Sequence, residues 1–250
     1  MVTNRPILGE NIVAIQSKAA SRTSSRAKGV SKSVQVHFET MDELKRVFPK
    51  SFPKNGSINL KDRRTIVSLP PVLRAAGTLT VSGCSRLEYL PASRDMIFQV
   101  EAEGCTSLKS IDPDYAAFEG VLYLNNCPSL ECLPEGMRLK GGGSLFLENC
   151  TALKSLPDGL EVDGKLAIDG CTGLTELPEN LKAGFLYMQG CTNVKALPAT
   201  LHADIIYLKG CDGIQIPQEL VDRMDKAGFI FYPDEYEIIK SPSMHDSPCL

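Results

Sequence analysis

The stretch of sequence that decides the fold is GCTGLTELPENLKAGFLYMQGCTNVKALPATL, which runs from Gly170 to Leu201. Within it, the tripeptide Gly-Cys-Thr returns after 20 residues, and the pattern Leu-Pro-x-x-Leu returns at the same interval. Self-similarity at a fixed period of roughly 20–50 residues indicates a repeat architecture, in which each unit needs its neighbours to bury a core. The strict interval also raises the question of why a cysteine occupies this position.

The cysteines set the register of an array that covers most of the chain. Their successive spacings are 21, 22, 23, 21, 20 and 20 residues. Apolar residues stand at positions −5, −3 and +3 from each cysteine, and Leu-Pro follows at +6 and +7 in five of the seven repeats. An eighth repeat precedes these, with Arg63 in place of the cysteine. The column consists of Cys84, Cys105, Cys127, Cys150, Cys171, Cys191 and Cys211.

The pattern L-x-L-x-x-C-x-x-L-x-x-L-P-x-x-L resembles the leucine-rich repeat over roughly Ser57 to Leu220. The resemblance implies an α/β-type, right-handed solenoid with short parallel strands on its concave face and helical caps at its N- and C-terminal ends. The short period and the Leu-Pro-x-x-Leu half are similar to bacterial type III secreted leucine-rich-repeat effectors. The half around the cysteine also resembles plant intracellular immune receptors. The chain departs from the family pattern at position −8, where leucine is usual and small or polar residues stand here: Ala76, Gly142, Asp163, Ala183 and Ala203.

The register divides the chain into five segments. We expect a disordered, basic, serine-rich tail at 1–33, an N-terminal cap at 34–56, eight repeats at 57–217, a C-terminal cap at 218–232 and a flexible tail at 233–250. Thr40 and Glu43 form the capping-box pattern of a helix start. The basic tail has three interpretations, which are a plain solvated tail, an uncleaved type III secretion signal and an organellar transit peptide.

Composition and charge argue against several function classes. The net charge of the chain is −3, and residues 1–35 carry +5, which leaves −8 for the rest. This balance gives no indication of nucleic acid or of an anionic membrane as a partner. Residues 1–30 lack the apolar block of a cleaved secretory signal. Nine cysteines without such a signal favour a reducing compartment. A reducing compartment fits the bacterial cytoplasm, and the resemblance to secreted effectors implies delivery into a host cell by a type III system. The alternative is a purely cytoplasmic protein.

Metal binding, disulfides, redox chemistry and architecture compete to explain the cysteine column. A structural zinc ion needs four ligands around one point, whereas a column spreads its thiols along an axis. Adjacent rungs about 4.8 Å apart would allow a disulfide by distance. In leucine-rich repeats, however, the chain turns inward here and leaves backbone groups without strand partners, which an inward Asn or Cys satisfies. We favour this structural explanation, and we interpret Cys132 and Cys249, which lie off the column, as incidental thiols.

The search for catalytic groups finds little. The histidines His37, His202 and His245 stand in unrelated segments, and no known catalytic or phosphate-binding motif is present. The glycine-rich stretch at Lys140–Ser144 is best explained as a loop insertion in the longest repeat. About 30 residues follow Leu220, which is too few for the ligase domain of the secreted family members. We therefore predict that the chain is not an enzyme and uses no cofactor or metal.

The residues at −6, −4 and −2 are predicted to point out of the concave face. Four aromatic residues gather in the −4 column, which favours a contact with a partner over an interpretation in which they shield the strands or pack against the chain's own tail. Acidic residues beside them favour a protein partner with a basic or mixed basic and apolar surface. The predicted contact residues are Tyr123, Phe146, Phe185, Tyr187, Ile205, Tyr207, Glu101, Glu103, Glu148 and Asp169.

The predicted function is therefore non-catalytic protein binding by a monomer. The resemblance extends this to a bacterial effector that engages a host protein. Two alternatives stay open, a substrate adaptor for a ubiquitin ligase encoded elsewhere and an intracellular scaffold.

Overall fold

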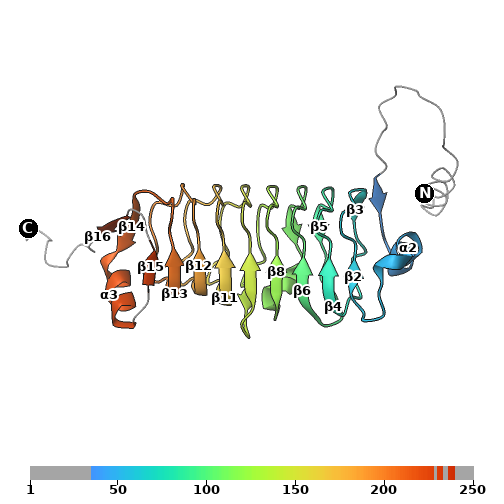
Figure 1. Ribbon diagram of the computed structural model, residues 1–250, viewed down its shortest axis with the longest axis horizontal. Helices are drawn as coiled ribbons and strands as arrows, with labels where there is room; N and C mark the ends of the chain where they lie inside the picture. Colours follow the sequence, from blue (N-terminus) through green and yellow to red (C-terminus); the bar gives the residue numbers. More distant parts are fainter. Residues whose placement is uncertain (1–34, 228–229, 233–235, 240–250) are drawn as a thin grey trace, which may run out of the picture. The chain divides into compact units, whose positions relative to one another are not determined.

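The computed structural model describes residues 35–227, 230–232 and 236–239. These residues form a β-solenoid of parallel strands with about seven turns and few helices, as the repeat period predicted. Figure 1 shows the strands side by side in one row, with helix α2 at one end of the row and helix α3 at the other. The basic tail predicted at 1–33 lies outside the described residues.

The main sheet takes one strand from each predicted repeat. Its order is β2-β4-β6-β8-β10-β11-β12-β13-β15, every pairing is parallel, and β9 (Arg138–Leu139) pairs with β11 beside this path. The last strand, β15, supplies a ninth rung after α3. The strands are β2 (Ile58–Asn59), β4 (Gly77–Thr80), β6 (Ile97–Glu101), β8 (Val121–Tyr123), β10 (Ser144–Phe146), β11 (Glu161–Ala167), β12 (Lys182–Tyr187), β13 (His202–Tyr207) and β15 (Ile230–Tyr232).

Shorter elements occupy the other side of the turns and the two ends. Strand β1 pairs with β3, β5 with β7, and β14 with β16, all in parallel. These elements are β1 (Val36–His37), β3 (Ile66–Ser68), β5 (Tyr89–Leu90), β7 (Ser110–Ile111), β14 (Ile214–Pro217) and β16 (Tyr236–Ile239), the helices α2 (Met41–Val47) and α3 (Gln218–Ala227), and the 3-10 turns η1 (Pro49–Ser51) and η2 (Pro113–Ala117).

The core follows the −5 and −3 columns of the repeats. Every residue at these positions is buried in the described repeats, and the register places them directly above one another, as with Leu145 beside Leu122 and Leu166. The period of two along a strand sends these side chains to the inner face and leaves the intervening residues on the outer face of the sheet, which we call the sheet face. The core is thus one continuous apolar column rather than a set of separate clusters.

The residue before each cysteine position has a left-handed backbone. Its φ lies between 58° and 74° in all eight repeats, a conformation that glycine adopts freely and that Asn and Asp tolerate better than other residues. This conformation turns the chain inward after the strand, and it explains the Gly-Cys pairing in the sequence. The eight residues are Asp62, Gly83, Gly104, Asn126, Asn149, Gly170, Gly190 and Gly210.

The cysteine column satisfies backbone carbonyls inside the solenoid. Each thiol donates to the carbonyl oxygen of the −3 residue of the preceding repeat, over Sγ–O distances of 2.9–3.2 Å, and all seven thiols are buried and free. This confirms the architectural explanation of the column. The donor and acceptor pairs are Cys84 and Leu60, Cys105 and Val81, Cys127 and Ala102, Cys150 and Leu124, Cys171 and Leu147, Cys191 and Ile168, and Cys211 and Met188.

Burial keeps these thiols protonated. It raises the pKa of Cys84 to about 11 and the pKa of Cys127 to about 12, because a thiolate would lose its hydration inside the apolar column. A protonated thiol retains the hydrogen that it donates to the carbonyl. A buried thiol with a raised pKa is also a poor nucleophile.

Helix α2 lies at the N-terminal end of the solenoid. Thr40 and Glu43 form the predicted capping box, and Leu44 is fully buried. Phe48 packs against the core, and the guanidinium carbon of Arg63 lies 5.1 Å from the centroid of its ring. Arg63 occupies the cysteine position of the first repeat. Its neighbour there is Phe48, at the end of α2, instead of another repeat. That this helix acts as a cap stays a prediction.

The C-terminal end differs in part from expectation. Helix α3 forms as predicted and buries Leu220 and Met224. The flexible tail predicted at 233–250 is wrong for Tyr236–Ile239, which forms β16 and pairs with β14. Backbone pairing with an edge strand organises this segment, and periodicity of the repeats gives no signal of it. In the described part of the chain, no helix is long and apolar enough to cross a membrane.

The positions of the thiols predict their reactivity. Cys132 is exposed, whereas the seven column thiols are buried, so an alkylating reagent should modify Cys132 quickly in the native protein and the column only in denaturant. Position-resolved mass spectrometry after short exposure measures this. Rapid native labelling at Cys105 or Cys171 would contradict the buried column.

Replacement of Cys171 by Ser should destabilise the fold. Serine is smaller and more polar, and burial of a hydroxyl with imperfect pairing costs on the order of 1–3 kcal/mol. Urea denaturation should show this loss relative to wild type. The matched control is Cys132→Ser at an exposed position, which should leave the midpoint unchanged. Equal midpoints for the two variants would refute the proposed role of the buried thiol.

Candidate functional site

The ten predicted contact residues all lie on the sheet face or directly after its strands. Six carry apolar or aromatic side chains, and each is partly buried instead of fully exposed. The aromatic and apolar members are Tyr123 in β8, Phe146 in β10, Phe185 and Tyr187 in β12, and Ile205 and Tyr207 in β13. The acidic members are Glu101 at the end of β6, Glu103 just after it, Glu148 after β10 and Asp169 after β11.

The aromatic residues of the −4 column stack in two pairs. The rings of Tyr123 and Phe146 have centroids 4.8 Å apart and planes 9° from parallel, and those of Tyr187 and Tyr207 lie 4.4 Å apart at 10°. Each pair occupies adjacent rungs in register. Ala167 stands between the pairs and is 3% exposed. The −4 column therefore presents two stacked aromatic pairs, one on each side of the small, buried Ala167.

The stacked pair of Tyr187 and Tyr207 also makes polar contacts. Desolvation and then a side-chain hydrogen bond with Tyr187 raise the pKa of Tyr207. The Lys165 ammonium lies 5.9 Å from the centroid of the Tyr187 ring, within the range of a cation–π interaction. Phe185 and Ile205 are register partners two residues earlier on the same two strands. Together, Phe185, Tyr187, Ile205 and Tyr207 form one surface, which we call the aromatic patch.

Not every residue at −6, −4 and −2 is exposed to solvent. Thr80, Ser82, Asn125 and Ala167 on this face are buried. Neighbouring rungs are only about 4.8 Å apart, so larger side chains above and below cover the small ones. The sequence pattern gives the direction of each side chain but not the size of its neighbours on adjacent rungs.

The first acidic residues are engaged within the sheet face. The carboxylate of Glu101 accepts hydrogen bonds from Thr80 Oγ1 at 3.0 Å and from Gln99 Nε2 at 2.6 Å. The carboxylate of Glu103 accepts from Asn125 Nδ2 at 3.5 Å. These contacts orient both carboxylates. Glu103 is exposed, and Glu101 is partly exposed.

Glu148 and Asp169 lie after the adjacent strands β10 and β11, and the charge of Asp169 disfavours ionisation of Glu148. Burial, then the charges of Asp169 and Glu103, raise the pKa of Glu148. Burial raises the pKa of Asp169, although the backbone N–H of Gln189 donates to its Oδ1 at 2.6 Å. A cationic side chain placed over this row would relieve the repulsion. Among the described residues, no group of three or more His, Cys, Asp or Glu side chains could hold a metal ion.

The two histidines in the described residues lie in different elements. His37 Nδ1 is 3.1 Å from Ser68 Oγ, and His202 Nδ1 is 2.7 Å from the carbonyl oxygen of Thr200. His245 and Cys249 lie outside the described residues.

The sequence analysis missed a second apolar surface. Met96 and Phe98, at the start of β6, are 73% and 60% exposed and border a groove of about 250 Å³. The available signal was the run Met96-Ile97-Phe98, since a strand that alternates between two faces cannot bury three consecutive large side chains.

Comparisons with protein-family models, with curated proteins and with solved structures gave no match to this chain.

The repulsion at Glu148 predicts a pH-dependent effect on stability. Because its folded pKa is raised, the folded state binds this proton more tightly than the unfolded state, and that contribution is lost as pH rises through the folded pKa. Glu148→Gln should therefore stabilise the protein at pH 7, by less than about 1 kcal/mol for a partly exposed group. The gain should vanish below about pH 4, where the unfolded glutamate is also protonated.

Thermal melting across this pH range measures the effect. Glu176→Gln, at an exposed position remote from the acidic row in sequence, is the control and should show no such trend. A Glu148→Gln variant that is less stable at pH 7 than wild type would contradict the interpretation.

Proposed function

We propose that this chain is a non-catalytic protein-binding module of the leucine-rich-repeat type that contacts its partner through the sheet face. The observation that carries the proposal is the aromatic patch, together with the acidic residues Glu103, Glu148 and Asp169 after earlier strands of the same parallel sheet. Aromatic side chains on an ordered backbone offer a large contact area at a small cost in conformational entropy. Such residues are enriched among those that dominate binding energy.

The acidic row gives the proposed partner its chemistry. Glu103, Glu148 and Asp169 lie along the −2 column, two positions beyond the residues of the aromatic column. The raised pKa of Glu148 supports a site at which a lysine or arginine of the partner would be favourable. Charge complementarity of this kind mainly increases the rate of association and the specificity. The proposed partner is therefore a protein whose surface combines apolar and basic residues.

The biological setting of the proposal rests on the repeat pattern. Its similarity to type III secreted effectors supports a role in which the chain engages a protein of a eukaryotic host. The experiment below therefore uses a eukaryotic lysate as its source of partners.

The double change Tyr187→Ala and Tyr207→Ala tests the proposal. Truncation of interface aromatics typically costs about 2 kcal/mol or more, which is roughly a thirtyfold loss of affinity. The variant should therefore fail to retain proteins that wild type captures from a eukaryotic lysate. Loss of the stacked pair costs the fold about 0.5–1.5 kcal/mol, so melting should fall by only a few degrees. Quantitative mass spectrometry of bound proteins and circular dichroism supply the two readouts.

Tyr89→Ala is the matched control. Tyr89 is 40% exposed and lies in β5, which belongs to a different sheet, and its hydroxyl donates to Asp112 Oδ2 at 2.8 Å. This variant loses one exposed tyrosine but leaves the sheet face intact, so capture should persist. If the double variant captured the same proteins as wild type, the sheet face would not be the binding surface.

A further inference from the structure

A second apolar surface lies at the start of β6, outside the aromatic patch. Met96 and Phe98 are among the most exposed large apolar side chains in the described residues, at 73% and 60%. They border a groove of about 250 Å³ that Tyr115 and Phe118 also line. Large apolar side chains exposed together beside a hollow mark a contact site more often than an isolated exposed leucine does.

A bulge in β6 turns Phe98 outward. Ile97 pairs with Gly77 and Gln99 pairs with Thr78, so Phe98 has no partner residue on β4. An extra residue of this kind breaks the alternation of side chains and re-aims the one that is left unpaired. Ile97 takes the inward position and is 8% exposed. Phe98 therefore cannot enter the core without displacing Ile97, and its exposure is a property of the strand pairing.

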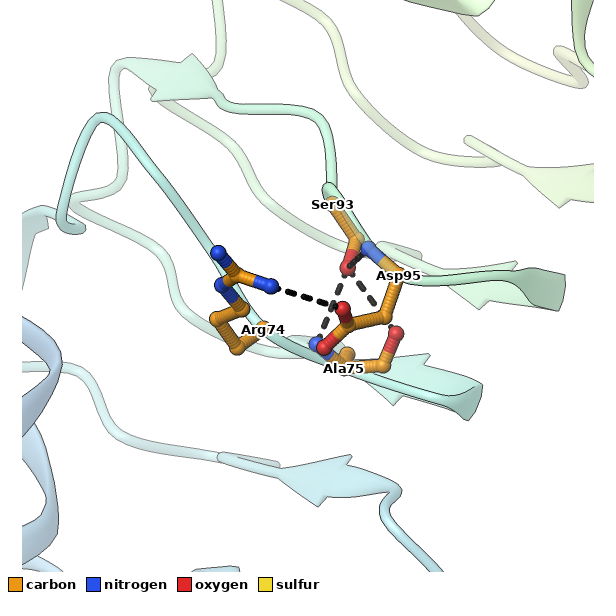
Figure 2. A network of polar contacts seen from close by, with 4 residues as sticks. All are labelled: Arg74, Ala75, Ser93 and Asp95. Carbon is orange, nitrogen blue, oxygen red and sulfur yellow. Dashed lines mark hydrogen bonds and ion pairs between the residues drawn. The ribbon is translucent and has the colours of Figure 1, made fainter.

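The loop before β6 is fixed to the preceding repeat, as Figure 2 shows. Ser93 Oγ accepts from the backbone N–H of Ala75 at 2.9 Å and donates to the carbonyl oxygen of the same residue at 2.9 Å. It also accepts from the backbone N–H of Asp95 at 3.3 Å, and the Asp95 carboxylate pairs with Arg74 at 3.2 Å. These contacts hold the backbone next to Met96, so the edge of the groove is ordered before any partner arrives.

The floor of the groove is rigid. Tyr115 is 1% exposed, donates its hydroxyl to the carbonyl oxygen of Pro91 at 3.2 Å and packs edge-on against Phe118 with centroids 5.7 Å apart. Gly120 lets the next strand begin close by, since a Cβ there would lie 2.3 Å from the carbonyl oxygen of Phe98 and 2.9 Å from the Phe118 ring. A partner would meet a preformed hollow rather than one that must open.

Three carboxylates line the groove, and two of them, Asp95 and Asp114, are paired with arginine side chains. Its lining includes Asp95, Asp114 and Glu119 and contains no Lys, Arg or His. Asp114 pairs with Arg94 at 3.3 Å across the surface. Glu119 is exposed and makes no ion pair within the residues that the structure describes. A cation that enters the groove would therefore find an available carboxylate beside the apolar rim.

We propose that this groove docks a short segment of a partner protein that inserts one large apolar side chain next to a lysine or arginine. The volume of about 250 Å³ is smaller than the roughly 300–1,000 Å³ typical of small-molecule pockets and suits one inserted side chain. Met96 and Phe98 would flank the inserted side chain, and Glu119 would pair with the cation. The groove shares no lining residue with the aromatic patch.

An array of synthetic peptides tests the proposal with the full chain. Each peptide has seven residues with a central Leu, Met or Phe, flanked on both sides by Lys or Arg, by Gln, or by Glu. We expect peptides with basic flanks to retain the most wild-type protein, peptides with Gln flanks to retain less, and peptides with acidic flanks to retain the least. Met96→Ser with Phe98→Ser should reduce retention at least tenfold. Glu119→Gln should remove most of the difference between the basic and the neutral series, and added salt should have the same effect.

Two controls separate this site from the aromatic patch and from damage to the fold. Tyr187→Ala with Tyr207→Ala should bind the peptides as wild type does, whatever its behaviour toward lysate proteins. Met96 and Phe98 are largely exposed, so their replacement should leave circular dichroism and melting close to wild type. Glu119→Gln provides a readout of the same site even if the double serine variant were to lose stability.

Three results would overturn the proposal. The first is equal retention of wild type and the double serine variant, and the second is a preference for acidic peptides or no retention of any series. The third is a concentration-dependent dimer of wild type in sedimentation that the double serine change abolishes, since the occupant would then be a second copy of this chain.

Discussion

The fold depends on one constraint, which is the need to satisfy inward-facing carbonyl oxygens where the chain leaves each strand. A buried carbonyl without a donor costs on the order of 1–3 kcal/mol, and a solenoid meets the problem once per turn. Here the carbonyl oxygen of Leu147 accepts two hydrogen bonds, from the backbone N–H of Cys150 in its own turn at 3.1 Å and from the thiol of Cys171 in the next repeat at 3.0 Å. Because the thiol and the carbonyl belong to different repeats, their bond also fixes the offset between them. A side chain at one position thus links satisfaction of the backbone to the stacking of the array.

The same constraint explains the residue types around the cysteine. The preceding residue must adopt a positive φ to direct the chain inward, so Gly, Asn or Asp occupies that position in all eight repeats. The thiol itself must be small, apolar enough for the core and able to donate weakly. Burial raises the pKa of the column thiols, which keeps the donated hydrogen in place and makes these groups unreactive. The repeated cysteine, whose regular spacing could suggest a metal or redox site, therefore has a structural role.

The architecture was predictable from sequence because it repeats. The −5 and −3 columns, the cysteine direction and the parallel rungs all follow from period and alternation, and the structure bears them out at Leu145, Cys150 and Leu166 alike. Structural features that occur only once in the chain were not predictable. The bulge at Phe98 depends on how β6 meets β4, and the pairing of Tyr236–Ile239 with β14 depends on an edge that exists only in the folded chain. For the candidate site, sequence gave the column of each side chain but not the ring stacking or the burial of Ala167.

The regular stacking also determines what the surface can present. A parallel ladder brings equivalent positions of successive repeats within about 4.8 Å of each other, so two aromatic residues in one column must stack or separate. Tyr187 and Tyr207 stack, and both side chains remain partly exposed. Burial raises the pKa values of both Glu148 and Asp169, and the charges of Asp169 and Glu103 raise that of Glu148 further. The parallel sheet thereby holds aromatic side chains and carboxylates in neighbouring columns. A partner that carries both apolar and basic side chains would gain from contacts with both.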